Sequence, residues 1–219
     1  MDRPATTARP LTTTDLVPPR AAAALLGVAG VLFGAYPALR PYTDETSADG
    51  AVAFTSPAWV LSHLAAVGFF VLLPLGLLGL RSVAGRGTAA VLTAWFGVGA
   101  VLPYYGGETF GLQAVGAEAL RTGDTAVLAA ADVVRFGTAP IVLFAAGVLL
   151  LAACGVLVVL AVRRSASGPG WTGLPLGAGL VLFLPQFFAG PPLRIAHGLL
   201  MAVGCLLLAR WTARGASSA

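Results

Sequence analysis

Residues 138–162 read TAPIVLFAAGVLLLAACGVLVVLAV, a run of 25 residues without a charged side chain. As an α-helix this run is about 37 Å long, enough to cross the roughly 30 Å hydrocarbon core of a bilayer. A core helix of a soluble domain rarely needs so long an apolar stretch. The run therefore predicts a transmembrane helix.

The composition of the whole chain favours the same class. Hydrophobic residues make up 58% of the 219 residues, charged residues 10%, and the mean hydropathy is +0.88. A soluble domain of this composition would expose too much apolar surface to water. We expect an all-α integral membrane protein, a six-transmembrane-helix bundle, with spans at residues 21–39, 58–80, 88–105, 138–162, 173–188 and 192–209.

Three regions follow from this assignment. Residues 1–19 are rich in Thr, Pro and Arg without an apolar period, which predicts a disordered cytoplasmic tail. Residues 20–210 form the transmembrane domain, and residues 211–219 form a second cytoplasmic tail. A cleaved signal peptide is the alternative for the first apolar run, but the run is long for one and no convincing small-x-small cleavage site follows it.

The arginines give the orientation. All thirteen basic residues are Arg, which indicates a GC-rich coding genome, and we expect a bacterial cytoplasmic (inner) membrane. Placing the N-terminus inside puts nine arginines in the cytoplasm and leaves four outside, at Arg40, Arg121, Arg135 and Arg194. This distribution follows the positive-inside rule, so both termini are predicted to be cytoplasmic. Seven of the nine acidic residues then lie outside, at Asp44, Glu45, Asp49, Glu108, Glu118, Asp124 and Asp132.

The longest connection, residues 106–137, joins the third and fourth spans. Helix-forming residues lie on either side of Gly123 and Asp124, which predicts two short outer helices with a break between them. Such a segment would lie in the membrane interface or fold over the outer mouth of the bundle. Asp132 and Arg135 are three residues apart at the entrance of the fourth span and are expected to pair.

Aromatic residues and cysteines add expectations about packing. The four tryptophans are predicted to anchor the chain at the membrane interfaces. The four tyrosines fall near the outer interface and are expected to do the same, with lining a pocket as the alternative for Tyr104 and Tyr105. Cys154 and Cys205 are interpreted as small apolar packing groups.

Polar side chains from several spans converge on the outer leaflet. The only two histidines, His63 and His197, each lie roughly 8 Å from the outer end of their span. Glu108 lies just beyond the outer end of the third span, and Arg194 lies one turn before His197 on the same face. Ionisable groups at membrane depth face a bundle interior or a water-filled cavity by default. The sequence therefore predicts an outward-facing polar pocket centred on His63, Glu108 and His197.

Two hypotheses give this pocket a cofactor. His63, His197 and Glu108 have the side-chain chemistry to bind Zn²⁺ and leave a position for water, which would suit hydrolysis of a lipid-borne substrate. No HExxH-like pair supports this hypothesis. Alternatively, His63 and His197 are the axial ligands of a haem b, with Arg135 and Arg194 near its propionates.

Two further hypotheses need no cofactor. The pocket could bind a small molecule or a lipid headgroup, in a binding protein or a permease, with Arg135 and Arg194 recognising an anionic group; the absence of deep charged residues argues against conduction. The chain could instead be an accessory subunit in which the histidines tie helices together and the arginines snorkel. The expected partners are the lipid bilayer and such a ligand. Phosphate-binding loops, the GxSxG elbow and nucleic-acid-binding stripes are absent from the sequence.

Overall fold

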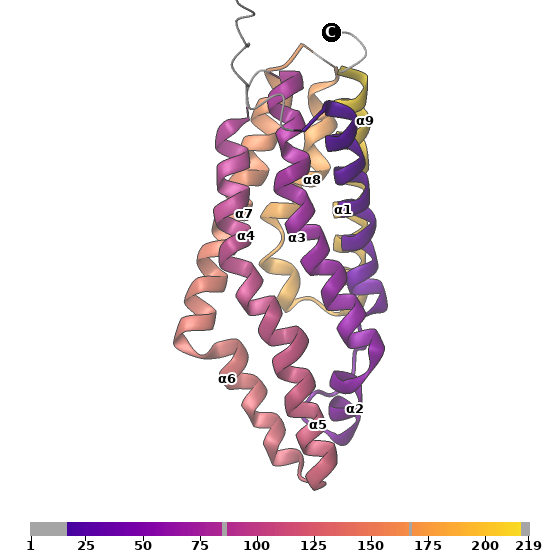
Figure 1. The fold of residues 1–219 in the computed structure, drawn as a ribbon, viewed down its shortest axis with the longest axis vertical. Helices are drawn as coiled ribbons and strands as arrows, with labels where there is room; N and C mark the ends of the chain where they lie inside the picture. The colour runs from indigo at the N-terminus through magenta and orange to yellow at the C-terminus, as the bar shows by residue number, and fades with distance from the viewer. Residues whose placement is uncertain (1–16, 85–86, 167, 216–219) are drawn as a thin grey trace, which may run out of the picture.

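The computed structural model describes residues 17–84, 87–166 and 168–215, and the regular elements in these ranges are all helical. Most of them run along one long axis (Figure 1). Within the described ranges, five helical stretches are long and apolar enough to cross a membrane: Pro19–Leu39, Pro57–Arg81, Thr88–Thr122, Thr138–Arg163 and Pro191–Gly215. The chain is therefore an apolar helical bundle, as its composition predicts. Most of the two predicted tails lies outside the described residues.

The long helices are α1 (Pro19–Leu39), α3 (Pro57–Ala84), α4 (Thr88–Gly106), α7 (Thr138–Arg163) and α9 (Pro191–Gly215). Helix α1 packs against α3 and α9, and α4 packs against α7. A Cβ atom on Gly30 would lie 2.7 Å from the Cβ atom of Cys205, so glycine permits the close approach of α1 to α9. Cys154 and Cys205 are free and buried, which confirms their interpretation as packing groups.

The segment predicted as the fifth span is broken. It consists of a 3₁₀ turn at Gly170–Gly173, helix α8 (Leu174–Val181) and a second 3₁₀ turn, η4 (Pro185–Phe188). Helix α8 packs against α7 and α9. The eight residues of α8 cover only about 12 Å, so the expectation of one continuous helix over residues 173–188 is not met.

Pro185 explains part of this break, because it has no N–H group to donate to the carbonyl of Val181. The hydrogen-bond pattern also changes just before Pro185. The N–H of Phe183 donates to the carbonyl of Leu180 at 3.4 Å, three residues back, whereas in a continuing α-helix it would donate to the carbonyl of Gly179. The carbonyl of Gly179 instead lies 2.8 Å from Nε2 of His197 on α9. His197 therefore supplies the hydrogen bond that the broken helix does not provide.

A small helical cap extends the bundle at one end (Figure 1). We use "the cap" for α2 (Ala48–Thr55), α5 (Leu112–Thr122), the 3₁₀ turn η2 (Thr125–Ala129) and α6 (Ala130–Phe136). The helical run Thr88–Thr122 has 35 residues and a length of about 52 Å, so α5 projects beyond the length that a bilayer core requires. Rather than lying across the bundle, α5 continues the line of α4 (Figure 1).

The cap has its own apolar core of buried side chains, which includes Phe54, Trp59, Leu112 and Leu128. The predicted break between its helices is confirmed. Gly123 ends α5 with a φ of 71°, and the Asp124 side chain accepts a hydrogen bond from the N–H of Ala126.

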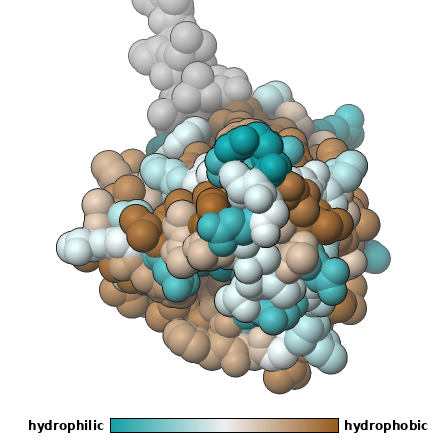
Figure 2. Space-filling view, turned by 90° about the horizontal axis from the view of Figure 1, so that it is seen from below, coloured by the Kyte–Doolittle hydropathy of each residue, from teal (hydrophilic) through white to brown (hydrophobic). Residues whose placement is uncertain are grey.

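The charged residues divide between the two ends of the molecule. The start of α1 and the end of α9 lie at the end opposite the cap (Figure 1). Arginines gather at that end, which we call the arginine end: Arg20, Arg81, Arg163, Arg164, Arg210 and Arg214. Figure 2 views the opposite, cap end, where hydrophilic side chains cover the projecting cap and apolar side chains surround it. The molecule therefore has two chemically different ends separated by apolar helices.

The role of His197 can be tested with His197→Phe, which keeps a ring against Phe33 and Phe183 but removes the donor to Gly179. An unsatisfied buried carbonyl costs about 1–3 kcal/mol, so we expect a lower thermal unfolding temperature in detergent and faster hydrogen exchange over residues 179–184. His197→Gln, which retains an N–H donor, should recover part of the loss. A His197→Phe protein as stable as the wild type would contradict this role.

Candidate functional site

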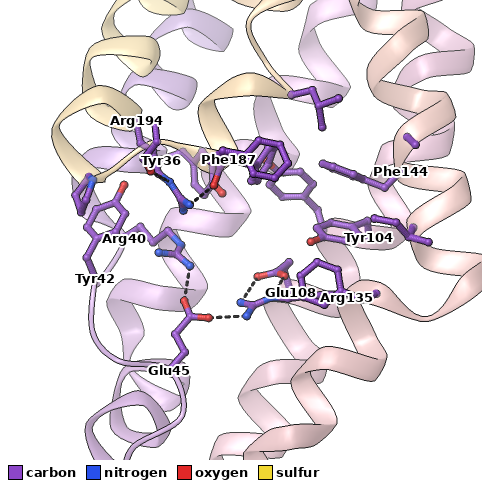
Figure 3. A pocket seen from close by; sticks show the side chains of 18 of the residues that line it. Tyr36, Arg40, Tyr42, Glu45, Tyr104, Glu108, Arg135, Phe144, Phe187 and Arg194 are labelled. Carbon is purple, nitrogen blue, oxygen red and sulfur yellow. Dashed lines mark hydrogen bonds and ion pairs between the residues drawn. The ribbon is translucent and has the colours of Figure 1, made fainter.

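A cavity of about 680 Å³ lies where the bundle meets the cap. This size is in the range of small-molecule binding sites. Its wall combines an ionic cluster, aromatic rings and exposed apolar residues (Figure 3). The residues that line it include Tyr36, Arg40, Tyr42, Glu45, Tyr104, Tyr105, Glu108, Arg135, Phe136, Phe144, Phe187, Phe188 and Arg194.

The ionic cluster on one wall is organised by Arg135 of α6. Its guanidinium donates from Nε and Nη2 to both carboxylate oxygens of Glu108, at 2.5 and 3.0 Å, and from Nη1 to Glu45 at 2.5 Å. Arg40, at the end of α1, binds the other oxygen of Glu45 at 2.6 Å. This network joins three separate parts of the chain: the linker between α1 and α2, the turn after α4, and α6 (Figure 3). Arg135 is thus bound to Glu108 and Glu45, and the expected pairing with Asp132 is not found.

The network shifts the pKa of its members outside the spans. Burial by itself raises the pKa of Glu45, but Arg135 and Arg40 more than offset this effect, so the pKa lies below its ordinary value. Burial lowers the pKa of Arg135, whereas Glu108 and Glu45 raise it, and the net pKa lies above the ordinary value. Glu45 is therefore charged at neutral pH and binds two guanidinium groups.

Glu108 is positioned by an irregularity in its helix. After α4 the helix continues through a π-helical turn, η1 (Gly107–Gly111), before α5 begins. The Glu108 side chain is buried, and the backbone carbonyl of Glu108 accepts a hydrogen bond of 2.8 Å from the indole N–H of Trp59. Turns of this kind often occur at functional sites. Trp59 is fully buried, so its interpretation as an interface anchor is wrong.

A second wall is aromatic. Tyr104 of α4 and Phe144 of α7 stack with their ring centroids 4.2 Å apart, and Phe187 of η4 packs edge-on against Phe144 at 5.3 Å. Tyr36 and Tyr105 meet in a T-shaped contact at 5.8 Å. The Tyr105 hydroxyl is buried and makes no hydrogen bond of 3.5 Å or less within the described part of the chain. All four tyrosines of the chain line the cavity, including Tyr42.

Arg194 lies on a third side of the cavity, at the start of α9. Its Nε donates to the carbonyl of Ala189 at 2.9 Å and its Nη2 to the carbonyl of Phe187 at 2.5 Å. In residues 17–84, 87–166 and 168–215, no carboxylate lies within 4.0 Å of this guanidinium. Arg194 therefore adds a positive charge to the cavity wall that the glutamates of the ionic cluster do not neutralise.

The two histidines lie behind the cavity wall and are not among its lining residues. Nδ1 of His63 lies 2.8 Å from the carbonyl of Trp59, and its Nε2 lies 3.8 Å from Glu108. His63 packs against Tyr36, whereas His197 packs against Phe33 and donates to Gly179. The structure therefore brings His63 and Glu108 together and directs His197 elsewhere.

This arrangement bears on the predicted cofactors. His63 donates one ring nitrogen to a carbonyl and leaves the other facing a carboxylate, an arrangement also seen in metal-binding histidines. Among the described residues, however, no group of three or more His, Cys, Asp or Glu side chains is arranged to hold a metal ion. The zinc site and the haem b site remain predictions from the sequence.

No protein-family model, curated protein or solved structure matches this chain.

Sequence reasoning identified three of the charged cavity residues, Glu108, Arg135 and Arg194, but did not pair Arg135 with Glu108 or include Arg40 and Glu45. It also gave interface roles to the tyrosines. Their grouping was a signal: in a chain with only four tyrosines, all four fall at the same predicted membrane level. Amphipathic rings serve equally well at an interface and in a binding cavity, so this signal did not distinguish the two.

The ionic cluster predicts that Arg135→Met destabilises the protein. The substitution leaves the buried Glu108 carboxylate without its arginine and Glu45 with Arg40 alone, and breaking a buried ion pair costs about 3 kcal/mol. Folding lowers the pKa of Glu45 below its ordinary value of 4.5. The ionised Glu45 carboxylate therefore stabilises the fold at neutral pH, and this contribution is lost as the pH falls from 4.5 through the lower pKa of the folded state. Thermal unfolding in detergent at pH 7 and pH 4 measures both effects.

Arg121→Met is the matched control. Arg121 pairs with Glu118 on the exposed face of α5, where water screens the ion pair and its contribution to stability is small. Equal effects of the two substitutions at pH 7 would show that the cluster around Arg135 is not a special determinant of stability.

Proposed function

We propose that this chain is a six-span membrane protein of a bacterial cytoplasmic membrane that binds an amphipathic small molecule or lipid in a cavity facing the outer leaflet. Both termini are cytoplasmic in this proposal, and the broken segment around α8 is the fifth crossing. The two charged ends support the orientation, because the arginine end carries most of the positive charge and the cap end most of the acidic residues.

One observation carries the binding function: the cavity is ionic on one side and apolar at its mouth. Phe136 and Phe188 line the cavity and are 63% and 86% exposed. Ile141 and Leu184 also line it and are exposed to a lesser degree. A site for a water-soluble ligand would be expected to have a polar entrance. A ligand that is dissolved in the bilayer can enter past apolar side chains such as these. This wall favours a ligand that has both a polar and an apolar part.

The buried core beyond the cavity favours binding over conduction. Toward the arginine end the described core of α3 consists of apolar side chains such as Leu73, Leu77 and Leu80. The buried Thr212 hydroxyl, near that end, is bound to the carbonyl of Leu208. A permease would need polar groups to solvate a charged substrate along its path. The described residues support a binding site that opens at the cap end.

The orientation is tested by single cysteines on a Cys154→Ala, Cys205→Ala background. Ala48→Cys in the cap should react with a membrane-impermeant maleimide added outside intact spheroplasts. Ala166→Cys at the arginine end, also exposed, should react only after permeabilisation. The reverse pattern would contradict the proposed orientation.

The binding function is tested by filling the cavity. Ala145 of α7 lines it, whereas Ala146, the next residue, is exposed and does not. We expect Ala145→Phe to place a ring in the cavity and remove a ligand that the wild type retains through purification. Ala146→Phe should keep that ligand. Native mass spectrometry and analysis of organic extracts measure moles of ligand per chain; equal content in all three proteins would favour an accessory subunit without a ligand in this cavity.

A further inference from the structure

The charges of the cavity wall are not balanced. Three arginines, Arg40, Arg135 and Arg194, line it against two glutamates, Glu45 and Glu108, which gives a net charge of +1. Both glutamates are bound by Arg135, and Glu45 is bound by Arg40 as well. These four residues neutralise one another. The remaining charge is that of Arg194.

The guanidinium of Arg194 is held in place with donors to spare. It has five N–H groups, and two are used on the carbonyls of Ala189 and Phe187. Both bonds use the edge formed by Nε and Nη2, which leaves the edge with Nη1 for another acceptor. No acceptor for this edge is found in the described part of the chain. A planar guanidinium fixed in this way matches the oxygens of a phosphate or carboxylate.

A second, independent polar group lacks a close hydrogen bond. The Tyr105 side chain is 1% exposed and lines the cavity, and its buried hydroxyl makes no hydrogen bond of 3.5 Å or less in the described residues, so the neighbouring Tyr36 hydroxyl satisfies it only weakly. Buried polar groups without a partner are uncommon in native structures, and a bound ligand is one way to satisfy them. An oxygen of a ligand inside the cavity can accept this O–H.

The opening of the cavity indicates that the ligand also has an apolar part. The cavity is bounded there by Phe136 at the end of α6 and Phe188 at the end of η4, and both rings are mostly exposed. An acyl or prenyl chain passing between these rings keeps its apolar surface out of water, and the gain grows with each buried CH₂ group. A polar molecule without a chain gains nothing from this mouth.

We infer that the cavity selects an amphiphile with an anionic phosphate or carboxylate head, which Arg194 binds, and an apolar chain that leaves between Phe136 and Phe188 into the bilayer. This inference rests on the proposed binding function and specifies its ligand. Arg135 has a structural role instead: three of its five N–H groups are bonded to Glu108 and Glu45, and these carboxylates neutralise its charge.

The inference is tested by native mass spectrometry of the protein in a neutral maltoside detergent, titrated with three probes. These are lysophosphatidylglycerol, lysophosphatidylcholine with the same acyl chain, and glycerol phosphate without a chain. We expect the anionic lysolipid to bind at least about tenfold more tightly than the zwitterionic one, because both offer the same phosphate to Arg194 but only the zwitterionic one brings the positive charge of choline, which the arginine repels. Glycerol phosphate should bind more weakly than the anionic lysolipid.

Substitutions assign the selectivity to particular groups. Arg194→Gln should abolish the preference for the anionic lysolipid, and Arg121→Gln, which removes an arginine of the cap outside the cavity, should retain it. Arg194→Lys keeps the charge and should retain part of the preference, which separates charge recognition from support of residues 187–189. Tyr105→Phe should weaken anionic binding several-fold with little change in the unfolding temperature, since its hydroxyl makes no protein hydrogen bond of 3.5 Å or less in the described residues.

Each outcome has a distinct meaning. Equal binding of both lysolipids in wild type and Arg194→Gln overturns the anionic selectivity but leaves the proposed binding function intact, provided that Ala145→Phe weakens both. Tight binding of glycerol phosphate alone overturns the role of the mouth and indicates a soluble anion as ligand. No binding of any probe, with Ala145→Phe equal to the wild type, overturns the inference together with the proposed function.

Discussion

The charge-assisted hydrogen bonds of Arg135 hold the cap end together. One guanidinium binds Glu108, on the continuation of α4, and Glu45, in the linker after α1, and Glu45 also binds Arg40. These groups are largely buried, so water cannot readily replace the partner of a carboxylate that loses its arginine. Removing an arginine therefore leaves a buried negative charge, which destabilises the fold. Arg135 therefore connects the linker, the cap and the cavity wall, in addition to the apolar core of the cap.

Two departures from regular helix also lie at the cavity. The π-helical turn after α4 carries Glu108, and the break after α8 places Phe187 and Phe188 at the cavity. Each irregularity has a side-chain partner: Trp59 donates to the carbonyl of Glu108, and His197 donates to that of Gly179. In an apolar environment an unbonded carbonyl is costly, so the departures from regular helix occur where another helix supplies the donor.

The cavity combines features that are usually separate. Its ionic cluster is internally neutral and builds the wall, while Arg194 and the Tyr105 hydroxyl retain hydrogen-bonding capacity. Its mouth is made of exposed rings rather than polar groups. The wall therefore places a neutral ionic network beside an arginine whose charge that network does not neutralise.

The sequence by itself determined the class of the protein, most of its helices and the separation of charge between its ends, because length, apolarity and charge placement are local properties that a bilayer constrains directly. It also located the break at Gly123 and the polar level that contains Glu108, Arg135 and Arg194. Tertiary structure alone decided that Arg135 binds Glu108 and Glu45 rather than Asp132, that His197 caps α8, and that four tyrosines surround one cavity. These outcomes depend on which helices are neighbours and how they are rotated, and in chains this uniformly apolar the pattern of hydrophobic residues does not specify either.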